Sequence, residues 1–487
     1  MSQYPIHQCL HSYQKTYRLL QKFPDQLREV LASFHKNIID HNKATNALVE
    51  IYYKEIAKRK EEIIAQLKRK KTGKLPGLTV SIKDLLCYKG HPIQGASKIL
   101  EGFVSQITAT CVARLLQEDS IVIGRNNCDE FGMGSANEYS IYGPVRNPIS
   151  LDRVAGGSSG GSAAAVRSGM CHVSLGTDTG GSVRQPASFC GIVGFKPSYG
   201  LISRYGMLAY ASSFDTVGIL AHNIVDIAEV LEVIAGYDGQ DNTAYQGAIP
   251  SYSKHLTWQG KAQVAYLTEA INHERLQPAI RERCHDIFHL LASQGHCIEG
   301  VTFDLLDYVV PTYYILTTAE ARANLARYDG VRYGYRDQSA TNYQDMVIAT
   351  RTQGFGTEVK RRILLGTAVL SAEWQDAYYK KAQKVRAKIK KSLESILSKH
   401  DFIILPTTPT TAFKLHKDIQ EPIESYLADL YTVIASAAGL PAISIPYGID
   451  EQGLPIGIQI IGKRFDERNL LAFAHTLMCS IKNHAIT

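Results

Sequence analysis

Two glycine- and serine-rich segments, residues 156–162 and 176–182, hold the residue types and spacing most suited to chemistry. The second segment follows the apolar run 172–176, so we expect a turn that brings Ser182 beside the first N–H groups of a helix. Backbone N–H groups in that position can stabilise an oxyanion. Ser182 is therefore a candidate nucleophile, but a serine hydroxyl needs a base.

Histidine is the usual base for a serine nucleophile, yet the histidine nearest to Ser182 along the chain is His172, which is expected to begin the preceding strand. Lys83 is the better candidate, because it ends the predicted strand 78–82 and active-site groups of α/β folds emerge at strand ends. Burial would lower the pKa of the amine. A neutral Lys83 could then accept a proton through a relay hydroxyl, for which we select Ser158.

The elements that must position these residues are short β-branched runs separated by helical patterns. They predict an α/β fold, with a mixed and mostly buried central β-sheet covered by helices. Residues 450–453 are good turn chemistry for an antiparallel hairpin between the last two strands. Residues 10–70 have helical periodicity throughout, which predicts an N-terminal helical arm, 1–74, before one continuous catalytic domain, 75–487. The expected strands are 78–82, 121–124, 172–176, 263–267, 402–406, 442–446 and 456–462.

The composition is that of a folded globular protein, since 45% of the 487 residues are hydrophobic and 20% are charged. A net charge of +7 permits an RNA partner without indicating one. The sequence has no apolar run of roughly 18 residues, and residues 1–8 lack the layout of a signal peptide, so we expect no membrane association and a cytoplasmic location. Nine scattered cysteines indicate reduced thiols.

Several competing interpretations are weaker. The segments 156–162 and 176–182 lack the lysine of a P-loop, and the polar residues before Gly156-x-Ser158-x-Gly160 do not fit the strand of an α/β-hydrolase elbow. The basic segments 68–74 and 380–391 suit solvated helices better than an RNA-binding module. A cluster near residue 290 could ligate zinc, but we interpret it as an amphipathic helix and predict no metal. Its members are Cys284, His285, His289, His296 and Cys297.

The spacing of Lys83, Ser158 and Ser182, 75 and then 24 residues, resembles that of the amidase signature family. The segments GGSSGGSAAAV and GTDTGGSVRQPASFCGIVG are also similar to the motifs of that family. The resemblance implies a Ser-cis-Ser-Lys triad, with Ser182 as acyl-ester nucleophile, Ser158 as charge relay after a cis Gly157–Ser158 peptide bond, and Lys83 as base. The oxyanion would be held by the N–H groups of Ser182 and of Thr179, Gly180 and Gly181.

Within the family, the chain is similar to the branch that hydrolyses glutamine for tRNA-dependent amidotransferases. That resemblance implies that Tyr313, Arg362 and Asp429 hold glutamine. The chemistry agrees, because Asp429 can pair with an α-ammonium and Arg362 with an α-carboxylate. The segments that carry this narrower resemblance are 124–148, 195–218, 313–334, 354–367 and 424–446.

Members of that branch act in a heterotrimer with amidotransferase subunits called B and C. The resemblance implies that ammonia from glutamine passes to the B subunit, which amidates the mischarged Glu-tRNA(Gln) with ATP and Mg²⁺, so that no cofactor is expected on this chain. Whether Asp-tRNA(Asn) is also a substrate is left open by the sequence. The alternative is a standalone amide hydrolase of the same family, which would not need the pair formed by Arg362 and Asp429.

Overall fold

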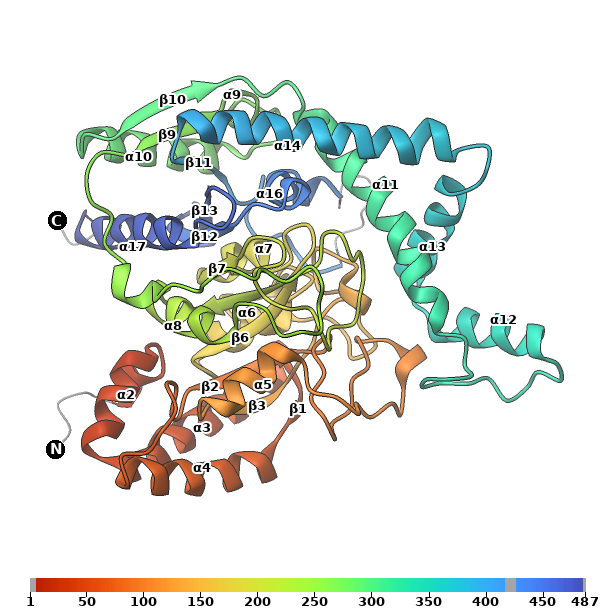
Figure 1. Cartoon of the computed structure of the whole chain (residues 1–487), viewed down its shortest axis with the longest axis horizontal. Coiled ribbons are helices and arrows are strands. Elements are labelled where there is room, and N and C mark those ends of the chain that lie inside the picture. Colours follow the sequence, from red (N-terminus) through yellow and green to blue (C-terminus); the bar gives the residue numbers. More distant parts are fainter. Residues whose placement is uncertain (1–5, 417–425, 485–487) are drawn as a thin grey trace.

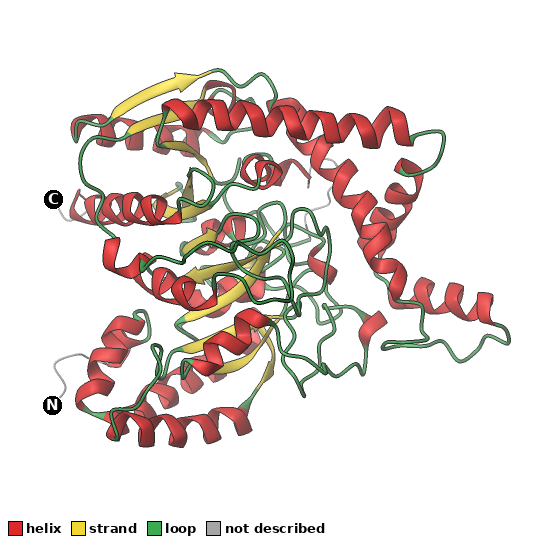
Figure 2. Cartoon of the chain, in the orientation of Figure 1, coloured by secondary structure: helices red, strands yellow, loops and turns green. Residues whose placement is uncertain are grey.

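The apolar runs form the strands of a large mixed sheet in the computed structural model, which describes residues 6–416 and 426–484 (Figures 1 and 2). The sheet has 11 strands in the order β1-β3-β2-β6-β8-β7-β12-β13-β11-β9-β10. Its strands are β1 (Leu48–Ile51), β2 (Thr79–Lys83), β3 (Ile121–Asn126), β6 (Val173–Asp178), β7 (Val193–Lys196), β8 (Thr216–Ala221), β9 (Gln263–Leu267), β10 (Cys297–Val301), β11 (Phe402–Pro406), β12 (Ala442–Ile449) and β13 (Pro455–Ile461). A separate ribbon pairs β4 (Arg146–Asn147) with β5 (Ser150–Val154).

Helices cover this sheet, which confirms the predicted α/β class. In Figure 1 the N-terminal helices lie at the β1–β3 end, and α9, α10 and α14 lie at the β9–β10 end. The α-helices are α1 (Ile6–Cys9), α2 (Tyr13–Lys22), α3 (Leu27–Thr45), α4 (Tyr53–Lys68), α5 (Thr110–Gln117), α6 (Gly160–Arg167), α7 (Arg184–Cys190), α8 (Ile224–Ile234), α9 (Thr268–Ile271), α10 (Pro278–Ser293), α11 (Leu306–Asn324), α12 (Tyr343–Gly354), α13 (Thr357–Val369), α14 (Lys381–Lys399), α16 (Thr432–Ala438) and α17 (Glu467–His484). Short helical turns are η1 (Pro24–Gln26), η2 (Lys98–Leu100), η3 (Glu130–Gly132), η4 (Tyr252–His255), η5 (Leu325–Arg327), η6 (Gln375–Lys380) and η7 (Leu427–Asp429).

The sheet is mixed, as predicted. β2 lies parallel to both β3 and β6, whereas β12 and β13 are antiparallel. The predicted turn joins β12 to β13, with the Gly453 N–H donating to the Asp450 carbonyl at 3.0 Å. Because Ile82 of β2 lies opposite Leu175 of β6, the carboxyl ends of these two strands meet at one edge of the sheet. That edge carries Lys83.

The prediction of helix throughout residues 10–70 is wrong at 48–51, which form strand β1. Helix α3 ends at Thr45, and the following residue Asn46 caps it with a φ of 56°, in the left-handed region. The following LVEI segment then pairs antiparallel with β3 at the edge of the sheet. Four apolar and acidic residues carry no periodicity that separates helix from strand, so pairing with β3 decides the outcome.

Strands β7 and β8 are not among the predicted strands, and each contains a glycine that lowers strand propensity. A Cβ built on Gly194 would lie 2.5 Å from the Ala187 Cβ, and one on Gly218 would lie 2.8 Å from a methyl group of Val183. The two glycines therefore let α7 and the residue before it lie directly on the sheet. This close approach fixes the turn that carries Ser182.

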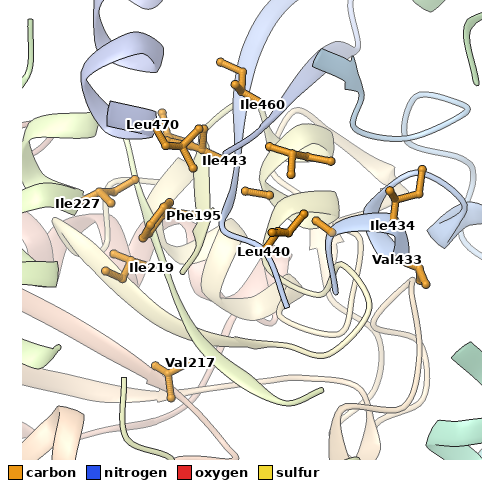
Figure 3. Close-up of a cluster of buried hydrophobic side chains, with 14 of the residues drawn as sticks. Phe195, Val217, Ile219, Ile227, Val433, Ile434, Leu440, Ile443, Ile460 and Leu470 are labelled. Atoms are coloured by element: carbon orange, nitrogen blue, oxygen red, sulfur yellow. The ribbon is translucent and has the colours of Figure 1, made fainter. Parts of the chain in front are cut away.

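The main core fills the space between the central strands and the helices α8, α16 and α17 (Figure 3). Aliphatic side chains dominate it, and the burial of each one stabilises the fold by roughly 1.5–3 kcal/mol. Those drawn include Phe195, Val217, Ile219, Ile227, Val433, Ile434, Leu440, Ile443, Ile460 and Leu470. The strands that carry the candidate site residues therefore stand on a buried, apolar core.

Two peripheral segments are helical, as predicted. The apolar face of the basic helix α14 is buried at Ile389 and Leu393 and packs on α11 and α16. In α10, Cys284 is buried whereas His285 and His289 are not. The described residues contain no group of three or more His, Cys, Asp or Glu that could hold a metal. Among them, no helix is long and apolar enough to cross a membrane.

Candidate active site

Lys83 ends β2 with its ammonium group fully enclosed. Its Nζ donates to Ser158 Oγ at 2.7 Å, to Ser159 Oγ at 2.9 Å and to Thr177 Oγ1 at 2.9 Å. Burial lowers the pKa of Lys83 to about 8, because the low-dielectric surroundings disfavour the charged ammonium. Three hydroxyl groups therefore hold the side chain, and loss of one proton would let Nζ accept a hydrogen bond from one of them. Ser159 and Thr177 are partners that the sequence analysis did not identify.

Ser158 lies in the turn before α6, and the Gly157–Ser158 peptide bond is cis, as the family resemblance implied. The Gly157 N–H donates to Gln185 Oε1 at 2.8 Å, and the Ser158 carbonyl accepts from the Asp129 N–H at 3.1 Å. A Cβ on Gly157 would lie 2.2 Å from Asp129 Oδ2, so only glycine fits this position. The backbone around Ser158 is held on both sides.

Ser182 lies in the turn between β6 and α7, with 8% of its surface exposed. Its carbonyl accepts from the Ser159 N–H at 3.1 Å, which places this turn against the turn of Ser158. Within the described part of the chain, no hydrogen bond uses the N–H of Gly180, Gly181 or Ser182. Three donors are thus available for an oxyanion beside the candidate nucleophile.

Two buried carboxylates fix the same turn. Asp178 pairs with Arg184, whose Nη2 lies 2.8 Å from Asp178 Oδ1, and both side chains are fully buried. Burial opposes ionisation, but the Arg184 guanidinium holds the pKa of Asp178 below its ordinary value. Asp215 accepts from Thr179 Oγ1 at 2.7 Å, and burial raises the pKa of Asp215 to about 6. The sequence analysis identified neither the pair of Asp178 with Arg184 nor the hydrogen bond from Thr179 to Asp215.

We expect Asp178→Asn to lower the free energy of unfolding by about 3 kcal/mol, because it leaves the buried charge of Arg184 without its counter-ion. Chemical denaturation followed by circular dichroism measures this change. The matched control is Asp376→Asn, which breaks a pair with Lys380 whose side chains are 57% and 77% exposed and should change stability little. Equal stability of the two variants would contradict the structural role of Asp178.

The three residues expected to hold glutamine come from α11, α13 and η7, and all are buried. A Cβ on Gly180 would lie 2.7 Å from the Tyr313 ring, so Tyr313 lies against the Ser182 turn. Tyr314 joins the other two residues: its hydroxyl donates to Asp429 Oδ2 at 3.1 Å, and its ring lies 5.1 Å from the Arg362 guanidinium carbon. The fold therefore gathers these residues at one place.

Arg362 has further partners that the sequence analysis missed. Its Nε donates to Glu358 Oε1 at 2.8 Å and its Nη1 donates to the Tyr210 hydroxyl at 2.7 Å. The guanidinium also faces the rings of Tyr210 and Tyr426, with each centroid 5.6 Å away. Among the described residues, Nη2 has no hydrogen bond and can donate to an anionic ligand. Only residue periodicity along α13, where Glu358 and Arg362 are four apart, could have indicated the first pair.

Comparison with known proteins gives consistent results. The Amidase family model matches residues 29–471. The chain is 48% identical over 433 residues to the A subunit of glutamyl-tRNA(Gln) amidotransferase from Acidobacterium capsulatum, covering 88% of this chain and 91% of the relative. It is 46% identical to the protein of the same name from Chlorobium luteolum, with 92% of each chain covered.

Comparison with solved structures gives the same family as the comparison of sequences. The crystal structure of the A subunit of glutamyl-tRNA(Gln) amidotransferase from Thermotoga maritima matches with a TM-score of 0.77 and 36% identity, covering 98% of this chain and 94% of that one. A bacterial aryl acylamidase of the amidase signature enzymes matches with a TM-score of 0.85 at 22% identity, covering 97% and 96%. The second likeness shows the fold alone.

Proposed function

The chain belongs to the amidase family, and from the site that it assembles we propose that it is the glutamine-hydrolysing A subunit of a tRNA-dependent amidotransferase. The observation that carries this proposal is that two sets of residues, one suited to cleaving an amide and one suited to binding an amino acid, lie side by side. The hydroxyl-held Lys83 and the Ser182 turn can cleave an amide, and Arg362 and Asp429 beside them can recognise an amino acid. Relatives of that name at 46–48% identity over most of the chain support it.

The proposed reaction begins with neutral Lys83 as base. Lys83 draws the proton of Ser182 Oγ through the Ser158 hydroxyl, and the serine oxygen attacks the side-chain amide carbon of glutamine. The oxyanion accepts hydrogen bonds from the backbone N–H of Ser182 and from those of Thr179, Gly180 and Gly181, which are the other proposed donors. The C–N bond then breaks, and the proton returns to the leaving nitrogen as ammonia. Water cleaves the glutamyl ester by the reverse relay.

Recognition of glutamine uses the buried charges at the other end of the site. We assign the α-carboxylate to Arg362 and the α-ammonium to Asp429, with Tyr313 packed between them and the Ser182 turn. Charge-assisted hydrogen bonds to buried groups are about twice as strong as neutral ones, which favours an amino acid over a simple amide. Burial raises the pKa of Asp429 to about 6, so its carboxylate is ionised at neutral pH.

The ammonia is consumed elsewhere. We propose that it passes to the partner B subunit, which amidates Glu-tRNA(Gln) with ATP and Mg²⁺, and that the C subunit completes the heterotrimer. The glycine-rich turns of this chain carry the reacting serines and have no phosphate-pairing lysine, which supports placing the use of ATP on the partner. The steps proposed for this chain use only its own side chains and backbone N–H groups.

The test uses this chain co-expressed with its two partner subunits. The complex is mixed with glutamine, quenched with acid within the first turnover, and analysed by peptide mass spectrometry together with ammonia and glutamate assays. We expect equal amounts of ammonia and glutamate and a transient glutamyl adduct on the Ser182 peptide. Cleavage of simple amides such as propionamide, but not of glutamine, would instead support a standalone amide hydrolase.

A further inference from the structure

Two side chains, those of Ser135 and Tyr314, donate hydrogen bonds to the Asp429 carboxylate. Ser135 Oγ donates to Asp429 Oδ2 at 2.8 Å, and the Tyr314 hydroxyl donates to the same oxygen at 3.1 Å. Among the described residues, no hydrogen bond reaches Asp429 Oδ1. A carboxylate oxygen accepts up to about two hydrogen bonds, so Oδ2 is saturated and Oδ1 is left for a ligand.

The position of Ser135 is fixed relative to the catalytic turn. Gln185 Nε2 donates to the Ser135 carbonyl at 2.6 Å, while Gln185 Oε1 accepts from the Gly157 N–H at 2.8 Å. Gln185 is fully buried in α7, the helix that follows Ser182. One side chain therefore holds both the backbone of Ser135 and the peptide that precedes Ser158. Through Gln185, the residue that donates to Asp429 is thus linked to the peptide that precedes Ser158.

We propose that Ser135 is a positioning residue that makes the site selective for amides carrying an α-ammonium group. This inference rests on the proposed function and deepens it, because it names what selects the substrate at the Asp429 end. Ser135 acts through Asp429 rather than on the amide. By occupying Oδ2 together with Tyr314, it turns Oδ1 toward the ammonium and holds the carboxylate in one orientation.

Comparing the hydrolysis of two substrates, glutamine and glutaramate, distinguishes this positioning role from a general contribution to the stability of the fold. Glutaramate, the monoamide of glutaric acid, keeps the amide and the carboxylate of glutamine and lacks the α-ammonium. Loss of a hydrogen bond to a charged group weakens recognition about tenfold or more. Ser135→Ala should therefore lower kcat/KM for glutamine about tenfold, mainly through a higher KM, and leave kcat/KM for glutaramate within about twofold.

The experiment measures ammonia release from both substrates by the complex with its partner subunits. Tyr314→Phe removes the second donor but keeps the ring over Arg362, and it should lower the preference for glutamine in the same direction. The matched control is Ser398→Ala, an exposed serine of α14 whose hydroxyl donates to the Ser395 carbonyl of its own helix. In an Asp429→Asn background, Ser135→Ala should have little further effect, since the two residues act as a unit.

The outcomes are distinguishable. If Ser135→Ala and Tyr314→Phe lowered kcat/KM equally for glutamine and glutaramate, or for neither, the positioning role would be wrong while the proposed function stood. If the wild-type complex released no ammonia from glutamine, the proposed function would fail and this inference with it. A selective loss for glutamine in both variants supports the inference.

Discussion

Replacing Ser182 with alanine is expected to lower glutamine hydrolysis on the order of 10⁵- to 10⁶-fold and to leave the fold intact. The loss is large because the neighbouring hydroxyl of the same turn, that of Thr179, is engaged by Asp215 and is not held by the Lys83 relay. The stability cost is small, because Ser182 Oγ has no hydrogen bond to any described residue. Steady-state ammonia release by the complex, together with its thermal unfolding curve, measures both quantities.

The matched control for this variant is Ser188→Ala on the adjoining helix α7. Ser188 is 1% exposed and its Oγ has no hydrogen-bond partner in the described structure, so the change has the same size in the same part of the fold. We expect this control to keep wild-type turnover. A Ser182→Ala complex with more than a few per cent of wild-type activity would show that another group attacks the amide.

The second large effect is expected for Lys83→Met, which keeps the length of the side chain and removes its amine. Glutamine hydrolysis should fall on the order of 10⁴-fold, since the relay then has no base. The pKa of Lys83 is lowered to about 8 by burial, so the protonated form dominates below that pH and cannot accept a proton. In the wild type, kcat/KM should therefore rise about tenfold per pH unit up to about 8 and level off above it.

A second buried lysine provides the control for that pH profile. Lys196 of β7 is fully buried and its pKa is lowered to about 7 by burial, but its Nζ donates to the Pro197 carbonyl rather than to either serine. Lys196→Met should leave the rise near pH 8 in place. If Lys83→Met retained substantial activity with an unchanged profile, the base would have to be sought elsewhere.

The local chemistry of the site was accessible from the sequence. Lys83 ends an apolar strand, and Ser182 follows a glycine-rich turn; both features depend on residues that are neighbours along the chain. The predicted strands 263–267 and 402–406 agree with β9 and β11 to the residue. An apolar run bounded by turn residues has few alternatives, so alternation and turn chemistry were sufficient for these elements.

The sequence-based predictions were wrong or incomplete where contacts between distant segments determine the local structure. Strand β1 pairs with β3 at the edge of the sheet, and β7 and β8 each contain a glycine where α7 or the residue before it lies close to the sheet. Local propensity in these segments is weak, so tertiary pairing overrides it. The same holds for Ser159 and Thr177, whose hydroxyl groups reach Lys83 only after β2 and β6 align.

Local sequence patterns were sufficient to predict the α/β class and the positions of most strands of the large sheet, and they singled out Lys83, Ser158 and Ser182 as candidates for an amide-cleaving site. The groups that hold those residues come from distant parts of the chain and were visible only in the folded structure. Ser135 and Asp429 are 294 positions apart, and Tyr210 and Arg362 are 152 apart, yet each pair is hydrogen-bonded. Periodicity reports which face of an element is buried, whereas the contact between two buried faces depends on how all the elements pack together.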